Sequence, residues 1–244
     1  IRDSSPGDAF ISLGTSGVLF VVTDAYRPAP QSAVHAFCHV LPNLWHQMSV
    51  MLSAASCLQW FCRLTGTTEV ALLAEIAELS EEEKAHAPFF LPYLSGERTP
   101  HNDPDARGMF WGMTHASLRA QLGYAVLEGV SFGINDGLQA LKESGTPIAQ
   151  CSLVGGGARS PFWAQLLADI LAMPVVTHKG GETGGALGAA RLACLAVGKP
   201  IAAVCEKPEV WQTWRADPVR HHTLMQRYAQ FKDLYLNDLN YRQH

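Results

Sequence analysis

Two glycine-rich turns in this sequence have the residue types that can bind a phosphate. The first, Gly14–Gly17 (GTSG), lies between two apolar runs, residues 8–13 and 18–23. Backbone N–H groups in such a turn can converge on one oxygen, and the hydroxyls of Thr15 and Ser16 add donors. The same four residues also suit an ordinary β-hairpin turn. This turn alone therefore leaves both phosphate binding and a plain hairpin open.

The second turn contains three glycines in succession. Gly155–Gly157 follows the apolar run 151–154, and Ser160 and Pro161 are typical of a helix N-cap and a first helical position. Anionic ligands bind at the carboxyl ends of strands and at helix N-termini in α/β proteins. A tight strand-to-helix turn requires one glycine, so three favour close approach of a ligand to the backbone.

A charged segment rich in proline and glycine covers residues 89–116, with a short strand expected at each side. A loop of this length inside a compact domain is usually functional or disordered. Arg98 could steady a phosphate or could pair with Glu97 or Asp105, and the structural ion pair is the favoured interpretation. His101 is expected to be a hydrogen-bonded loop histidine and not a substrate contact.

Three histidines, His35, His39 and His46, lie near one another in the chain and raise the question of a metal site. No third ligand of a suitable kind accompanies the two that are four apart, so strand histidines are the favoured interpretation. The six cysteines lie mostly in apolar stretches and lack the short repeated spacings of a zinc site. Reduced, buried thiols are expected, and no metal site is predicted.

Hydrophobic periodicity predicts the elements that would position these residues. We expect strands at 8–13, 18–23, 45–51, 151–154 and 174–178, and helices at 53–64, 67–88, 117–144, 160–171, 184–197 and in a last segment ending near Leu239. Gly129, Gly133 and Gly137 are four apart and share one helix face. Each costs the helix about 1 kcal/mol relative to alanine, which predicts that another backbone packs against this face.

Composition limits the class of protein. A chain of 244 residues can form one large or two small domains, and 48% hydrophobic with 16% charged residues is typical of a compact globular protein. A formal net charge of −4 without a run of Lys or Arg argues against nucleic acid as a partner. No apolar stretch is long enough to span a bilayer, so no membrane partner is expected.

The order of elements predicts the fold. Without insertions it is β-β-β-α-β-α-β-α, in which a hairpin and a third strand precede alternating helices and parallel strands. Such an order predicts an α/β domain with a mixed β-sheet covered by helices. This is one repeat of the actin-like, ribonuclease-H-like ATPase architecture, in which two such halves hold a nucleotide between them.

Four stretches resemble the carboxy-terminal half of the FGGY carbohydrate kinases, and within that family the kinases that act on xylulose. They are SLGTSG at 12–17, LPYLSGERTPHNDP at 91–104, GGGARSPFWAQLLADI at 155–170 and GALGAARLA at 185–193. The family's second signature is similar to Gly108–Met113 followed by Gln121, Leu122 and Glu128. The resemblance covers nearly the whole chain and weakens after residue 200.

The resemblance implies an activity and a set of site residues. It implies transfer of the γ-phosphoryl group of ATP, with Mg²⁺, to D-xylulose, giving D-xylulose 5-phosphate; positioning and charge neutralisation dominate such a reaction. Residues 1–244 would be the carboxy-terminal nucleotide-binding domain of a cytoplasmic sugar kinase. Carried over by position, the ATP-binding residues are Gly14 and Thr15 at the β- and γ-phosphates, Gly112 beside the nucleotide, and Gly156, Gly157 and Ala158 at the ribose and adenine.

Some expectations concern what this chain lacks or leaves open. The family's catalytic Asp is expected upstream of Ile1, together with an amino-terminal half and its sugar-binding residues, so the chain alone is expected to be inactive. Pro161 stands where several relatives have an Asn that contacts the nucleotide, and Glu128 is expected to be buried and structural. The alternatives are a non-catalytic actin-like nucleotide-binding or sugar-sensing module, and a kinase of the same family for another polyol or ketose. A homodimer is one assembly that the resemblance allows.

Overall fold

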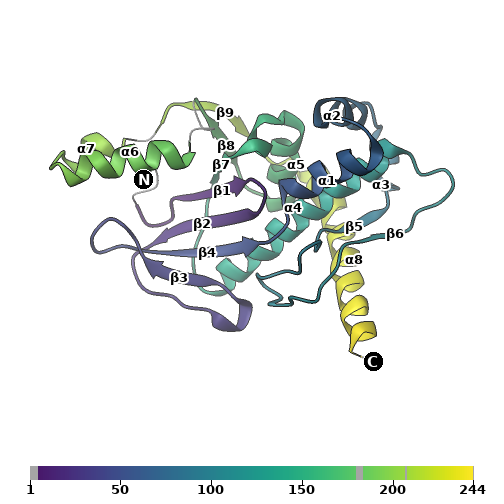
Figure 1. Cartoon of the computed structure of the whole chain (residues 1–244), viewed down its shortest axis with the longest axis horizontal. Helices are drawn as coiled ribbons and strands as arrows, with labels where there is room; N and C mark the ends of the chain where they lie inside the picture. The colour runs from purple at the N-terminus through teal and green to yellow at the C-terminus, as the bar shows by residue number, and fades with distance from the viewer. Residues whose placement is uncertain (1–4, 180–183, 207, 244) are drawn as a thin grey trace.

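The computed structural model describes residues 5–179, 184–206 and 208–243. A seven-stranded mixed sheet lies at its centre, with the strand order β3-β4-β2-β1-β7-β8-β9 (Figure 1). The strands of this sheet are β1 (Ala9–Leu13), β2 (Gly17–Thr23), β3 (His35–Cys38), β4 (Trp45–Met51), β7 (Cys151–Val154), β8 (Val175–His178) and β9 (Val210–Trp214). A separate two-stranded sheet pairs β5 (Phe89–Leu91) with β6 (Met109–Trp111).

Helices cover the sheet and form the rest of the body. They are α1 (Ala55–Thr65), α2 (Glu69–Ala77), α3 (Glu81–Ala85), α4 (Arg119–Glu143), α5 (Pro161–Leu171), α6 (Gly184–Ala196), α7 (Ile201–Val204) and α8 (Pro218–Arg242), with short 3-10 turns η1 (Pro30–Ser32) and η2 (Gly156–Arg159). In Figure 1 helices α6 and α7 lie at the left, at the opposite end of the molecule from the loop between β6 and α4. None of the described helices is long and apolar enough to cross a membrane.

Strand direction brings three strand ends to one edge of the sheet. β1 and β2 form the predicted antiparallel hairpin, in which Leu13 pairs with Gly17. β1 is parallel to β7, and β7 is parallel to β8, so the carboxyl ends of these three strands point the same way. The GTSG turn follows β1 and the triple-glycine turn follows β7. Both turns therefore lie at the same edge, because parallel neighbours end on the same side.

The predicted glycine face of α4 packs closely against three residues of β4 and β5. A Cβ added to Gly129 would lie 2.1 Å from the backbone oxygen of Phe90 in β5. At Gly133 and Gly137 the nearest atoms belong to the side chains of Met51 and Ser49 in β4. Close backbone approach is confirmed at Gly129, whereas side chains set the limit at the other two positions.

A buried ion pair joins α4 to α8. Glu128 is 1% exposed, which confirms that it is buried, and both its carboxylate oxygens accept hydrogen bonds of 2.7 Å from Arg227. Arg227 also donates to the backbone oxygens of Ala85, the last residue of α3, and of Ala87, two residues after it. A guanidinium with all these partners is satisfied, as a buried charge must be. The pair thus fixes three helices relative to one another.

Several elements differ from the sequence prediction. The segment 67–88 forms two helices because Ser80 caps a new one: its hydroxyl accepts from the N–H of Glu83, whose carboxylate accepts from the N–H of Ser80. Two edge strands, β3 and β9, were not predicted, and each is antiparallel to its neighbour. The last helix continues to Arg242. The order β1-β2-β4-α4-β7-α5-β8-α6 nevertheless matches the predicted actin-like, ribonuclease-H-like α/β fold.

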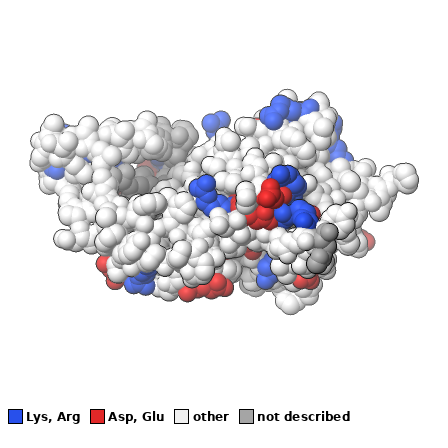
Figure 2. All heavy atoms as spheres, turned by 60° about the horizontal axis from the view of Figure 1, so that its bottom comes forward, with Lys and Arg blue, Asp and Glu red and all other residues white. Residues whose placement is uncertain are grey.

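Charge is distributed sparsely over the face shown in Figure 2. Positive and negative side chains are intermixed there, and much of the surface is uncharged. The polar network nearest the C-terminus includes Arg242, whose guanidinium pairs with Asp103 and Asp238 at 2.7 and 2.8 Å. Such pairing neutralises side chains locally and leaves no extended positive strip on this face.

Candidate functional site

The GTSG turn leaves the backbone donors of Thr15 and Ser16 free. The N–H groups of Ala54 and Ala55, at the start of α1, donate to the backbone oxygens of Thr15 and Gly14 at 2.9 and 2.8 Å. The carbonyls of the turn are therefore occupied. Within the described part of the chain, the N–H groups and hydroxyls of Thr15 and Ser16 donate no hydrogen bond, and both residues are exposed. The turn can offer up to four donors to an anion.

The triple-glycine turn contacts β1 through Leu13. Gly155 has φ of +92°, and a Cβ there would lie 2.8 Å from the backbone oxygen of Leu13; at Gly157 it would lie 2.4 Å from the Leu13 side chain. Packing therefore explains two of the three glycines, which the sequence analysis had attributed to a ligand. A Cβ on Gly156 would meet nothing within 4 Å, so Gly156 is the position that is open to solvent or to a ligand.

The helix after this turn begins as predicted. The Ser160 hydroxyl accepts a hydrogen bond of 3.2 Å from the N–H of Trp163, and Pro161 is the first residue of α5. The indole N–H of Trp163 donates to the hydroxyl of Ser131 at 3.0 Å, which fixes the start of α5 against α4. Trp163 is thus a core residue, and its position holds the turn rigidly.

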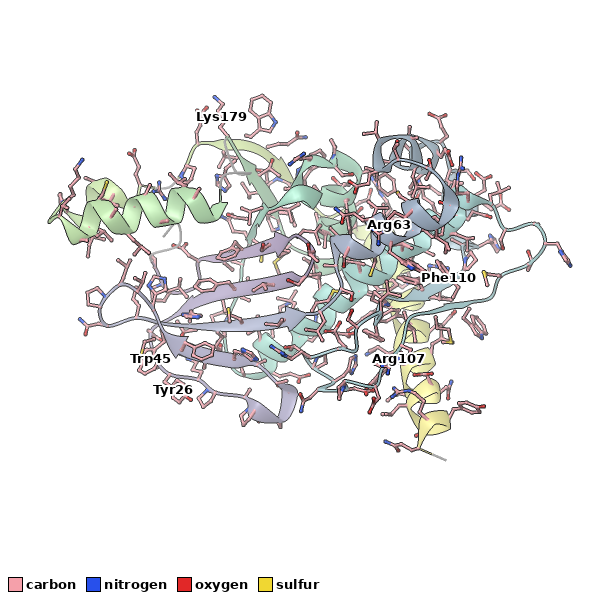
Figure 3. All side chains as sticks on the ribbon, in the orientation of Figure 1. Tyr26, Trp45, Arg63, Arg107, Phe110 and Lys179 are labelled. Carbon is pink, nitrogen blue, oxygen red and sulfur yellow. The ribbon has the colours of Figure 1, made fainter. Side chains whose placement is uncertain are left out.

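A cavity of about 420 Å³ opens beside the triple-glycine turn. Its lining includes Gly155, Ala158 and Pro161 of the turn and the start of α5, His178 at the end of β8, and Trp211 near the start of β9. A second group of cationic and aromatic side chains belongs to the same cavity. Arg159 on its wall is exposed and makes no ion pair with any described residue, while Lys179, labelled at the upper edge of the sheet in Figure 3, lies 6.0 Å from the ring centroid of Trp211.

The ends of β8 and β9 are held by hydrogen bonds. The His178 ring contacts the Ser152 hydroxyl at 3.1 Å and the Pro208 oxygen at 3.0 Å. Lys179 pairs with Glu209 at 2.7 Å. An aromatic ring with adjacent cations and a glycine-lined wall can accept a planar group that carries negative charge. Sequence reasoning missed Arg159, Lys179 and Trp211, because only the fold brings β9 beside β8.

Gly112 lies apart from the two turns. It follows β6 of the two-stranded sheet, has φ of +85°, and a Cβ there would meet nothing within 4 Å. The loop that begins there projects at the far right of Figure 1, whereas the β1–β2 turn and β7 lie near the centre. Gly14, Thr15, Gly156, Gly157 and Ala158 are thus brought to one edge of the sheet, and Gly112 is not in contact with them.

The charged loop forms different pairs from those expected. Arg98 is exposed and makes no ion pair with any described residue, so the predicted pairing with Glu97 or Asp105 is wrong. The Asp105 carboxylate instead lies 3.8 Å from Arg107, which Figure 3 labels on the outer side of this loop. The predicted hydrogen bond of His101 is confirmed, because its Nε2 lies 3.2 Å from the Tyr93 hydroxyl. Burial lowers the pKa of His101 to about 4.

The three early histidines lie in or next to β3 and β4, among aromatic rings. His46 in β4 stacks on Phe20 with ring centroids 4.6 Å apart, and the His39 ring is 6.2 Å from it. Burial lowers the pKa of His46 and of His39. Across the described residues, no three His, Cys, Asp or Glu side chains come close enough together to hold a metal ion. His35 lies in β3 and His46 in β4, as predicted for strand histidines, whereas His39 follows β3 outside the strand.

Comparison with known proteins gives a consistent result. The family model described as "FGGY family of carbohydrate kinases, C-terminal domain" matches residues 9–197. The chain is 46% identical over 229 residues to the xylulose kinase of Escherichia coli strain K12, covering 93% of this chain and 47% of that protein. It is 50% identical over 191 residues to the xylulose kinase of Klebsiella pneumoniae, covering 78% and 39% respectively.

A solved structure agrees with these sequence matches. The crystal structure of a "xyloylose kinase" from Brucella ovis matches with a TM-score of 0.91 at 44% identity, covering 98% of this chain and 50% of that one. The chain thus spans about half, or less, of the length of these relatives. Since the family's C-terminal domain is matched over most of the chain and the fold agrees, this protein belongs to the FGGY family of carbohydrate kinases.

Proposed function

We propose that this chain is the nucleotide-binding part of an ATP-dependent kinase that converts D-xylulose to D-xylulose 5-phosphate. The observation that carries the proposal is 46% identity to a xylulose kinase, spread over 93% of the chain. A match over 93% of the chain is not confined to one motif. Phosphoryl transfer to xylulose is the reaction that the name of that relative, xylulose kinase, describes.

In this proposal the two turns and the cavity bind ATP. The free N–H groups of Thr15 and Ser16 would donate to the β- and γ-phosphates, because they are the exposed unpaired donors of the GTSG turn. The open face of Gly156 and the backbone near Ala158 would accommodate the ribose and adenine. Gly112 would approach the nucleotide only if its loop lies against the bound ligand. Gly157 would act indirectly, through its packing on Leu13.

The catalytic contribution of this chain would be positioning and charge neutralisation. Phosphoryl transfer demands that the γ-phosphate be held in line with the attacking hydroxyl, and preorganised N–H donors do this without reorganising during the reaction. Mg²⁺, when bound, would neutralise phosphate charge; no cluster of three metal ligands exists among the described residues, so we assign it to none of them. We assign the general base to no residue of this chain.

The experiment is a measurement of ADP release by the full-length protein that contains this chain. With ATP, Mg²⁺ and D-xylulose, we expect ADP release to rise well above the rate with ATP alone. A rise with a different ketose or polyol, and none with D-xylulose, would contradict the proposed substrate. Tight ADP binding without turnover on any sugar would favour the non-catalytic nucleotide-binding module.

The proposal also includes location and assembly. Six free cysteines, four of them buried, are compatible with a reducing compartment and support a cytoplasmic enzyme. A homodimer stays a prediction, and light scattering of the full-length protein at several concentrations checks it. A mass equal to one subunit at all concentrations would contradict it.

A further inference from the structure

Glu97, in the loop between β5 and β6, is a buried carboxyl group with an incomplete set of partners. Glu97 is 3% exposed. Oε1 accepts hydrogen bonds from the N–H of Leu52 at 3.0 Å and of Arg98 at 2.7 Å. Oε2 is buried and has no hydrogen-bond partner among the described residues. Burying a carboxyl group with an unpaired oxygen costs free energy, which makes Glu97 a candidate for a functional role.

The partner of Glu97 leads directly to the GTSG turn. Leu52 follows the last residue of β4, and Ala54 and Ala55 lie two and three positions after it. The N–H groups of Ala54 and Ala55 support the turn by donating to Thr15 and Gly14. Three N–H groups within four residues thus have fixed partners. That of Leu52 donates to the Glu97 carboxyl group, and those of Ala54 and Ala55 donate to carbonyls of the turn.

The loop that carries Glu97 is itself firmly held. Glu97 and Asp103 exchange both backbone hydrogen bonds at 2.8 Å. The Asp103 carboxylate accepts from Arg242 at 2.7 Å and from the Tyr235 hydroxyl at 3.1 Å, both in α8. Gly96, with φ of +75°, lies so close to Pro104 that a Cβ would be 2.7 Å from its oxygen. The carboxyl group of Glu97 is therefore presented from a rigid support.

Several titratable or charged groups face Glu97. Burial raises its pKa to about 7, and the Asp136 carboxylate of α4 adds to this effect, while the N–H groups of Arg98 and Leu52 and the Arg98 charge oppose it. Glu97 in turn contributes to the raised pKa values of Cys57 in α1 and of Tyr93 after β5. None of these groups forms a hydrogen bond with Oε2 of Glu97. The N–H groups of Leu52 and Arg98 therefore supply the hydrogen bonds to the Glu97 side chain among the described residues.

We propose that Glu97 is a positioning residue for phosphate binding: its carboxyl group holds the Leu52–Ala55 backbone, and that backbone holds the GTSG turn with its donors facing outward. Glu97 does not contact the nucleotide in this proposal. The inference rests on the proposed function, since it assumes that the turn binds phosphate.

The consequence is specific to the phosphates of the nucleotide. If Glu97 acts on the turn, its loss lowers the affinity for ligands that carry a β-phosphate. The affinity for adenosine stays unchanged, because adenosine would bind at the triple-glycine turn and the cavity. Loss of one supporting hydrogen bond to a buried group corresponds to about a tenfold change in affinity. A general loss of protein stability would lower the affinity for both ligands equally, or for neither.

The experiment compares ADP with adenosine in the full-length protein by calorimetry, and KM for ATP with kcat by kinetics. For Glu97→Ala we expect about a tenfold weaker ADP affinity with unchanged adenosine affinity. Glu97→Gln, which keeps the acceptor for Leu52 and Arg98, should restore ADP binding. If Glu97→Ala does not fold, Glu97→Asp withdraws the carboxyl group by one methylene and should show the same selective loss.

Thr99→Val is the matched control. Thr99 belongs to the same loop, is 2% exposed, and its hydroxyl accepts from the N–H of Val50 and donates to the oxygen of Ala33, each at 3.0 Å. It should lower the melting temperature without changing the ratio of ADP to adenosine affinity. Equal effects on both ligands in the Glu97 variants, or the same selective loss in Thr99→Val, would overturn the proposal. Failure of the wild-type protein to bind ADP would instead contradict the proposed function.

Discussion

Leu13, the last residue of β1, limits which residues the neighbouring turn can contain. Its backbone oxygen approaches Gly155 and its side chain approaches Gly157, whereas Gly156 between them is free. Single residues in one glycine run therefore serve different purposes: two permit packing, and one leaves a surface on which a ligand can lie. The difference can be tested because the three positions are adjacent.

We expect Gly156→Ala to leave the fold intact and to weaken ADP binding in the full-length protein. The added methyl group meets no protein atom within 4 Å, so it would occupy only the space proposed for the nucleotide. The melting temperature from a thermal scan should stay close to that of the wild type, while calorimetry should show the loss of affinity. Unchanged ADP affinity would remove Gly156 from the proposed site.

Gly155→Ala is the control for this prediction. It places a Cβ at φ of +92° and 2.8 Å from the Leu13 oxygen, so it should destabilise the protein by about 1–3 kcal/mol. A melting temperature equal to that of the wild type would contradict the packing role of Gly155.

At the scale of the element, α4 organises the domain. It packs against β4 and β5 and against α1, α2, α5 and α8, which explains why most of its residues are buried. Its glycine face allows β5 to approach, and Glu128 on its buried surface holds Arg227 of α8. Since Trp163 of α5 also bonds to Ser131 of α4, this helix holds the support of the triple-glycine turn.

Two substitutions on the glycine face of α4 should differ in their effect on stability. Gly129→Ala would bring a Cβ to 2.1 Å from the Phe90 oxygen, a backbone atom that cannot move away alone, and should cost about 1–3 kcal/mol. Gly133→Ala meets the end of the flexible Met51 side chain at 3.0 Å, so the gain in helix propensity of about 1 kcal/mol offsets the contact. Chemical denaturation of both variants measures the difference. Equal losses would contradict a close backbone approach at Gly129.

At the scale of the whole molecule, buried acids join the loop 92–108 to α4 and α8. Asp136 accepts a hydrogen bond from the Tyr228 hydroxyl, and its carboxylate lies 3.9 Å from His101. Burial raises the pKa of Asp136 to about 7, as it raises that of Glu97. Groups from three parts of the chain therefore titrate in the interior, beneath the surface of which Figure 2 shows one face.

We expect Glu97 and Asp136 to contribute a stabilisation that decreases as pH rises from 5 to 7. Glu97 and Asp136 have folded pKa values of about 7, above their unfolded values, so their stabilisation is present below the unfolded pKa and is lost as pH rises through 7. His101, with a folded pKa of about 4, has the opposite sign up to its unfolded value of 6.5. His39 and His46, whose pKa values burial also lowers, act in the same direction as His101, so the contribution of each acid is measured by removing that acid.

Asp136→Asn checks the assignment of this pH dependence. Its amide oxygen can still accept from Tyr228, but it does not titrate, so between pH 5 and pH 7 the slope of stability against pH should be more positive than that of the wild type by about 1.4 kcal/mol per pH unit. Urea unfolding at half-unit pH intervals gives the slopes for both proteins. Parallel curves for the variant and the wild type would show that Asp136 does not take up a proton in the folded state.

The local features of this protein were predictable from its sequence. The β1–β2 hairpin, the Ser160 cap, the glycine face of α4 and the order of the main strands and helices depend on alternation, on helical spacing and on the conformations that glycine and proline allow, which are properties of neighbouring residues. The resemblance of four stretches to FGGY kinases, which the family match bears out, rests on the same local signals.

Only the tertiary structure decided which of these features act together. Which glycines of the triple turn pack and which is open depends on Leu13, more than 140 residues away in sequence, and the free donors of the GTSG turn depend on the amides of α1. The partner of Glu97, the edge strand β9 and the pairing of Asp103 with Arg242 likewise join distant segments. No local pattern encodes such contacts, because they arise when the sheet and helices bury their apolar faces and bring these residues side by side.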